Sequence, residues 1–178
     1  MESNYNLREE DIKEGIRLCY QKVNSLLDNA ETILTQRGDR EIGSCLYTYA
    51  VEELGKLLLL QDSLKQKKNS DGTITIDLDI FGKGNEGGHT KKKFNRFRKN
   101  STIPERCKKL RYVKGGVSTG SSFTALFGIR PVDFLLRKQI LYTDWVRKKW
   151  LRHLDIEISD LQSAITELRK WMTDNITV

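Results

Sequence analysis

Apolar residues recur every three or four positions through most of this chain, which is the pattern of amphipathic helices. The first such stretch runs from Leu7 to about Arg37, where Gly38 is placed to end it. Asp39 can cap a second helix that continues to about Lys67. Because so short a turn joins the two helices, we expect them to pack antiparallel.

The same periodicity predicts further helices in the second half of the chain. They comprise a helix over 89–99, a short helix that starts at Pro104, a long helix from Pro131 to near His153, and a last helix from Asp155 or Ser159 with Leu161, Ile165, Leu168 and Met172 facing inward. The sequence therefore predicts an all-α fold, a bundle of four to five main helices in a single domain over residues 1–178.

Segment 69–88 lacks the helical period. Its middle, TITIDLDIF, alternates apolar and polar residues as a short strand does, whereas the following GKGNEGG is too rich in glycine for regular structure. The alternatives are a short β arm and a mobile insertion between helices. We expect the insertion.

The second helix carries a block of charge inside an apolar stretch, LYTYAVEELGKLLLL. Glu53 falls on the apolar stripe of this helix, whereas Glu52 is rotated about 100° away. A carboxylate in a core-facing row is costly unless it is paired, and Lys56 is its nearest local partner. The stripe consists of Leu46, Ala50, Leu57, Leu60 and Leu64.

Two interpretations of this block stay open. It can belong to a surface helix with one salt bridge, or Glu53 can face a polar cleft between helices. Gly55 favours the cleft, because glycine inside a helix costs about 1 kcal/mol relative to alanine and is better tolerated where a backbone or ligand approaches closely.

The composition indicates which partners the protein favours. The 178 residues carry a formal net charge of +7, which favours anionic partners such as nucleic acid. The three cysteines are widely spaced and match neither a disulfide framework nor a metal site. No apolar run is long enough for a signal peptide or a membrane span. We expect a cytoplasmic protein without metal or cofactor.

The positive charge is concentrated between Lys91 and Lys114, where Glu105 is the single acidic residue. Aromatic residues are interleaved with the cations, an arrangement that suits an RNA-binding surface. The alternative is a solvated basic face without a ligand. The candidate RNA-binding residues are Lys91, Lys93, Arg96, Arg98 and Lys99.

The stretch AVEELGKLLLL resembles the Glu-Glu-Leu-Gly-Lys signature of AbiV-type abortive infection proteins, which belong to the HEPN superfamily of helical bundles. Two further pieces support the resemblance. One is the His-x-x-Lys of His89 and Lys92 after the second helix. The other is Arg137 with LYTDW, in which Tyr142 and Asp144 match a Tyr-x-Asp pattern.

The resemblance covers roughly Leu7 to Trp150 and implies bacterial antiphage defence. HEPN relatives are often metal-independent ribonucleases that act as dimers. The resemblance therefore implies a homodimer, a target in RNA or the translation machinery, and a phage protein as trigger. Their usual motif is Arg-x4–6-His, and the literal match here is Arg147 with His153.

Two candidate sites follow. RNA cleavage without metal needs a base, an acid and cations, and the chain has only two histidines to serve as base. The alternative to both sites is a non-catalytic regulator that binds RNA, the translation machinery or a phage protein through the basic region. The first candidate site is His89, Lys92, Glu53, Lys56, Arg137, Tyr142 and Asp144; the second is Arg147 and His153.

Overall fold

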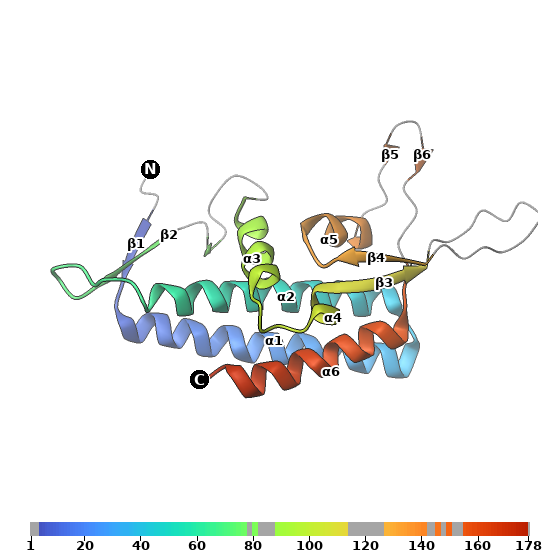
Figure 1. Cartoon of the computed structure of the whole chain (residues 1–178), viewed down its shortest axis with the longest axis horizontal. Coiled ribbons are helices and arrows are strands. Elements are labelled where there is room, and N and C mark those ends of the chain that lie inside the picture. The colour runs from blue at the N-terminus through green and yellow to red at the C-terminus, as the bar shows by residue number, and fades with distance from the viewer. Residues whose placement is uncertain are drawn as a thin grey trace, which may run out of the picture.

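The computed structural model describes residues 4–77, 80–81, 88–113, 127–141, 145–146, 149–150 and 155–177. Over these ranges the chain is mostly helical, so the predicted bundle is confirmed, and small sheets are added to it (Figure 1). The helices are α1 (Glu9–Arg37), α2 (Arg40–Ser63), α3 (Gly88–Lys99), α4 (Glu105–Lys108), α5 (Phe134–Leu141) and α6 (Ile158–Asn175). The strands are β1 (Asn4–Leu7), β2 (Ile74–Asp77), β3 (Lys109–Val113), β4 (Phe127–Pro131), β5 (Trp145–Val146), β6 (Lys149–Trp150) and β7 (Asp155–Ile156).

Helices α1 and α2 form the predicted antiparallel hairpin. Gly38 ends α1 at φ 63°, in the left-handed region that glycine adopts without strain. Asp39 then caps α2, since its side chain accepts a hydrogen bond of 3.0 Å from the Ile42 N–H. Both local expectations from the sequence are confirmed.

Helix α2 is the central element of the bundle. It contacts α1 on one side, and α3 and α5 on the opposite side, while α6 packs beside the α1–α2 hairpin (Figure 1). Burial therefore extends around most of α2 and is not confined to one stripe. The buried residues include Ser44, Tyr47, Thr48, Ala50, Val51, Glu52, Leu54, Gly55, Leu57 and Leu58.

Gly55 marks a point where α2 and α3 are in close contact. A Cβ atom placed on Gly55 would lie 2.2 Å from the Lys93 carbonyl oxygen of α3. The expectation that another backbone approaches this glycine is confirmed. The absence of a side chain at Gly55 thus sets the distance at which α3 can pack.

The alternating segment after α2 forms a strand. β2 pairs antiparallel with β1, with Asn4 opposite Asp77 and Leu7 opposite Ile74. Ile74 and Ile76 are buried against the bundle, whereas Thr75 between them is only half-buried. Over these four residues the β arm, and not a mobile insertion, is the correct alternative.

A second sheet follows α4, which starts after Pro104 as predicted. The strand order is β4-β3-β7, and all pairs are antiparallel. Leu110 of β3 is buried while its neighbours Lys109 and Arg111 are exposed, the alternation of a half-buried strand. Strand β3 was not predicted, because its residues lie within the basic run.

The expected long helix from Pro131 to near His153 is wrong. Pro131 ends β4, and the helix that follows is the eight-residue α5. The Asp133 side chain accepts a hydrogen bond of 2.9 Å from the Leu136 N–H, so the helix start is signalled by Asp133 and not by the proline. Beyond α5, β5 and β6 pair antiparallel.

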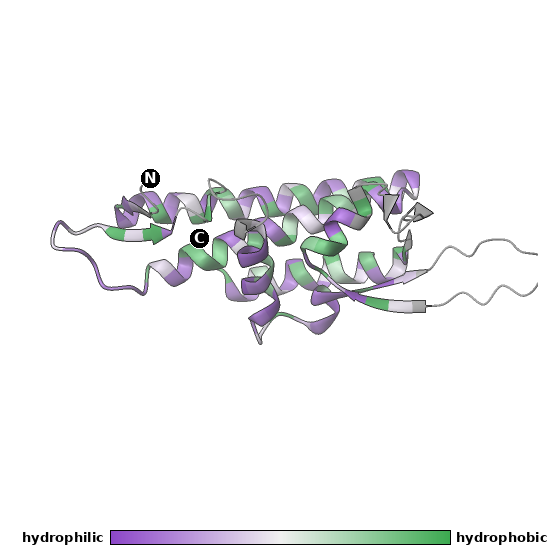
Figure 2. Ribbon diagram, turned by 90° about the horizontal axis from the view of Figure 1, so that it is seen from above, coloured by the Kyte–Doolittle hydropathy of each residue, from purple (hydrophilic) through white to green (hydrophobic). Residues whose placement is uncertain are grey.

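The last helix, α6, is placed as the apolar period predicts. Leu161, Ile165, Leu168 and Met172 are all buried. Figure 2 shows hydrophobic and hydrophilic residues interleaved along the long helices, as expected for helices that pack by one side or more. Within the described ranges, no helix is both long and apolar enough to cross a membrane.

Candidate functional site

The carboxylate of Glu52 lies at the centre of a polar cluster that joins three helices. Its Oε2 accepts a bond of 2.8 Å from Arg137 Nη1 of α5. Its Oε1 lies 3.5 Å from Lys93 Nζ and accepts a bond of 3.3 Å from the Thr90 hydroxyl, both on α3. Glu52 itself is only 9% exposed. A single buried carboxylate therefore holds cations from two other helices.

Glu53 occupies a different environment. It is half-buried, and its partner is Lys56 on the same helix, 2.7 Å away. The local pair is therefore as predicted, but the expectation that Glu53 faces the interior and Glu52 does not is wrong. The reason is that α3 and α5 cover the side of α2 that carries Glu52.

A sequence signal for this second buried side exists. Ser44, Thr48, Glu52 and Gly55 are spaced by four, four and three residues, so small or polar residues form a stripe of their own along α2. All four are buried. A search for apolar residues alone does not detect a stripe of this kind.

Arg137 is held on two sides. Its guanidinium carbon lies 4.7 Å from the centre of the Tyr49 ring, while its Nη1 binds Glu52. A cation above an aromatic face is attracted to it, and this contact strengthens where water is excluded. Tyr49 was not among the predicted site residues. It follows that the orientation of Arg137 is set by α2 at both contacts.

Lys93 is buried, although the basic run suggested an RNA-binding role for it. Burial lowers the pKa of the Lys93 ammonium from its ordinary value, and the negative charge of Glu52 opposes this shift. Glu53 and Lys56 also act on this pKa, so their pair lies close to the Glu52 cluster. Lys93 is therefore part of the interior cluster and does not belong to the basic surface.

Arg96 also forms an ion pair with another residue of the protein. Its Nε and Nη2 bind the two carboxylate oxygens of Asp62 near the end of α2. This bidentate contact lowers the pKa of Asp62. Lys92 is exposed and pairs with Asp77 of β2 at 2.8 Å. Among the predicted RNA-binding residues, Lys91, Arg98 and Lys99 are exposed.

Within the first candidate site, the structure pairs Glu53 with Lys56. Arg137 binds Glu52 and Lys92 binds Asp77, neither of which was a predicted site residue. His89 is the second residue of α3 and directly precedes Thr90, so its backbone enters the helix that contacts Glu52. Tyr142 and Asp144 lie outside the described residues, and so do Arg147 and His153 of the second candidate site.

The Glu52 cluster has features that phosphate chemistry requires. Arg137 and Lys93 are fixed cations in a largely dry setting, where charge stabilisation is stronger than in water. A lysine whose pKa is lowered by burial can exchange a proton more readily than a solvated one. In the part of the chain that the structure describes, no group of three or more His, Cys, Asp or Glu residues could hold a metal ion.

Comparison with known proteins supplies the family. The family model described as AbiV, a HEPN family, matches residues 11–170, nearly the whole chain. No curated protein and no solved structure matches the chain. The match includes α2, α3 and α5, which carry the Glu52 cluster. The chain therefore belongs to the AbiV family of HEPN proteins, and this membership implies a role in abortive infection, a form of antiphage defence.

Proposed function

We propose that this protein is a metal-independent ribonuclease, the effector of an abortive infection response that stops translation by phage or host. The observation that carries the proposal is the Glu52 cluster, in which α3 supplies Thr90 and Lys93. His89 lies in the first turn of the same helix. The candidate base and one cation of the cluster therefore belong to the same helix.

The roles follow from the chemistry of RNA cleavage. His89 takes the proton from the ribose 2′-hydroxyl, whose oxygen attacks the adjacent phosphorus. Arg137, which is only partly buried, stabilises the charge of the phosphorane, and the Lys93 ammonium adds positive charge from the interior. A water molecule protonates the departing 5′-oxygen. The products are a 2′,3′-cyclic phosphate and a 5′-hydroxyl. Glu52 acts as a positioning residue, because it holds both cations.

Other residues of the first candidate site keep supporting roles in this proposal. Lys92 lies on the exposed side of α3, where it can contact a phosphate of the substrate. The Glu53–Lys56 pair adjoins the cluster. Tyr142 and Asp144 are assigned to the site by the family pattern alone. We also expect a homodimer, by analogy with HEPN relatives, and sedimentation at micromolar concentration tests this.

His89→Ala is expected to reduce RNA cleavage by about 10²–10⁴-fold, because a general base contributes rate enhancement of that order. The measurement uses purified protein, labelled RNA and excess EDTA, with the 2′,3′-cyclic phosphate detected at the new end. Lys170→Ala is the control, since Lys170 is highly exposed on α6. Circular dichroism shows whether each variant is folded.

His153→Ala separates the two candidate sites. If this change abolishes cleavage while His89→Ala retains it, the Arg147–His153 site is the catalytic one. If the wild-type protein cleaves no RNA but still protects cells against phage, the ribonuclease proposal fails. The outcome would then favour a regulator without catalytic activity.

The second candidate function is such a regulator, binding RNA, the translation machinery or a phage protein. It is favoured by one observation: Lys91, Arg98 and Lys99 are exposed, whereas Lys93 and Arg137 are already bound to Glu52. Growth arrest on expression distinguishes the two functions. Arrest that survives His89→Ala but is abolished when the three exposed cations are changed to Glu supports binding.

A further inference from the structure

Two adjoining pockets follow the outward side of α3. The larger, about 230 Å³, extends from α3 to the turn between α4 and β3 and is lined in part by Lys99 and Lys109. The smaller, about 170 Å³, extends to the start of α5. Asn95 and Arg98 line both pockets. Because they share these two residues, the pockets adjoin, and we call them together the α3 groove.

Positive charge dominates the α3 groove. Its carboxylates already have cationic partners: Glu105 binds Lys108 and Lys109 at 3.1 and 3.0 Å, and Asp133 lies 3.8 Å from Arg98. Arg98, Lys109 and two further cations are exposed. A row of exposed cations along a groove attracts a polyanion and releases its counterions. The lining cations are Lys91, Arg98, Lys99, Lys108 and Lys109.

The α5 end of the groove is apolar. Leu135 is 61% exposed and lines the smaller pocket. Phe134 next to it is half-buried, and Lys138 Nζ lies 4.9 Å from the centre of its ring. Apolar and aromatic side chains bind the faces of unpaired bases, which a duplex keeps stacked and hidden.

We propose that the α3 groove binds single-stranded RNA, with phosphates along Lys91, Arg98 and Lys99 and a base against Phe134 and Leu135. This inference rests on the proposed ribonuclease function and assigns the path of its substrate. Lys91 follows Thr90 directly in α3, and Phe134 lies about one helical turn before Arg137 in α5. A strand in the groove therefore contacts α3 and α5, the two helices that supply the partners of Glu52.

The test uses a fluorescein-labelled, 2′-O-methyl oligouridylate of about 12 nucleotides, which cannot be cleaved through a 2′-hydroxyl. Its anisotropy is measured with the full-length protein over a range of salt concentrations. Arg98→Ala/Lys99→Ala is expected to weaken binding by about tenfold near 0.1 M salt. The slope of log Kd against log salt should become shallower by about 0.7 for each RNA phosphate that the variant no longer neutralises.

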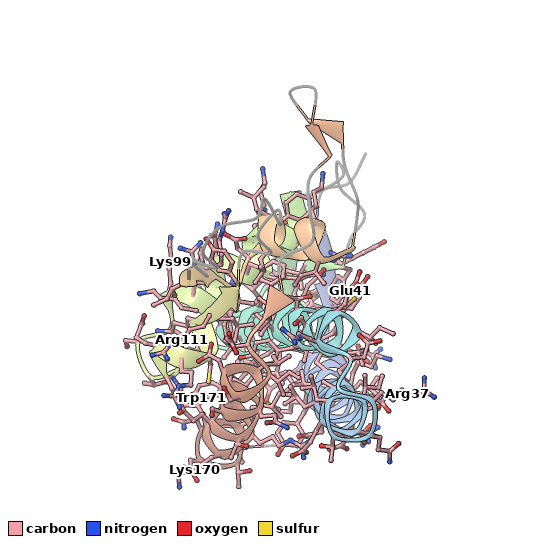
Figure 3. All side chains as sticks on the ribbon, turned by 90° about the vertical axis from the view of Figure 1, so that its right-hand side faces the viewer. Arg37, Glu41, Lys99, Arg111, Lys170 and Trp171 are labelled. Atoms are coloured by element: carbon pink, nitrogen blue, oxygen red, sulfur yellow. The ribbon has the colours of Figure 1, made fainter. Side chains whose placement is uncertain are left out.

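A matched pair of cations provides the control. Figure 3 shows Lys99 and Arg111 on the left side of the molecule, Arg37 on the opposite side and Lys170 at the lower edge. Arg37→Ala/Lys170→Ala removes the same charge from outside the groove and should leave both Kd and slope unchanged. Leu135→Ala should weaken binding of the single strand without changing the salt slope. Equal melting temperatures show that the variants are folded.

Several results would overturn the groove assignment. These are an absence of oligouridylate binding, equal losses of affinity in the groove and control variants, equally tight binding of an RNA duplex, or stronger binding of an acidic peptide, which would indicate a protein partner. If groove variants bind normally and wild-type protein cleaves RNA, the groove fails while the ribonuclease function stands. If the groove binds as expected but unmodified RNA stays intact, the groove stands and the ribonuclease function fails.

Discussion

Glu52→Gln is expected to lower the free energy of unfolding by about 3–5 kcal/mol, a large share of the stability of one domain. The change leaves Arg137 and the buried Lys93 facing an uncharged amide where a carboxylate had held them. Removing one partner of a buried ion pair is costly, because the remaining charge keeps its desolvation penalty.

Glu53→Gln is the matched control, with the same chemistry at the next residue of α2. Its partner Lys56 is half-buried and reaches water, so the decrease should be about 1 kcal/mol or less. Urea unfolding followed by circular dichroism measures both variants. Equal decreases for the two would contradict the assignment of Glu52 as the central carboxylate.

A double-mutant cycle sharpens this test. Glu52→Gln and Arg137→Gln should together cost less than the sum of their separate effects, with a coupling of about 1–3 kcal/mol. Their atoms are 2.8 Å apart, so they cannot act independently if the contact persists in solution. A coupling near zero would mean that α5 does not dock on α2 as described.

The second large effect is expected at Gly55. Gly55→Ala should destabilise the protein by about 2–3 kcal/mol, because the new methyl group would overlap the Lys93 carbonyl oxygen 2.2 Å away. A backbone oxygen on a packed helix cannot swing aside, so α3 must move away from α2. The usual gain of about 1 kcal/mol from replacing a helical glycine by alanine is outweighed.

Gly15→Ala provides the comparison for this change. A Cβ at Gly15 of α1 would meet the Leu60 side chain at 3.4 Å, close to an ordinary contact with a group that can adjust. This variant should therefore be as stable as the wild type or slightly more stable. The melting temperatures of the two variants, measured in parallel, test this difference in stability. Wild-type melting of Gly55→Ala would rule out the close α2–α3 approach.

How much the sequence predicts depends on how local each interaction is. The turn at Gly38 and the cap at Asp39 were predictable because each acts within a few residues. The Glu53–Lys56 pair was predictable for the same reason. The start of α5 was missed because Pro131 outweighed Asp133, although the carboxylate is the residue that caps the helix.

The centre of the site was not accessible to local reasoning. Glu52 and Arg137 are 85 residues apart in the chain, and no periodicity relates two such positions. The stripe of small and polar residues along α2 indicates a second side that can be covered, but it does not show which helices cover it. The burial of Lys93 has the same cause, since it depends on where α3 lies relative to α2.

The order of folding should follow the separation along the chain of the residues that make contact. The α1–α2 hairpin closes through the turn at Gly38 and Asp39, so it loses little chain entropy on forming, whereas docking of α5 must close the long loop between Glu52 and Arg137. We expect the hairpin to form the folding nucleus and α5 to dock later. Backbone amides of α5 should then exchange with solvent through partial opening, while those of α2 exchange only on global unfolding. We therefore expect that the helix that carries Arg137 opens and redocks while the α1–α2 hairpin stays folded.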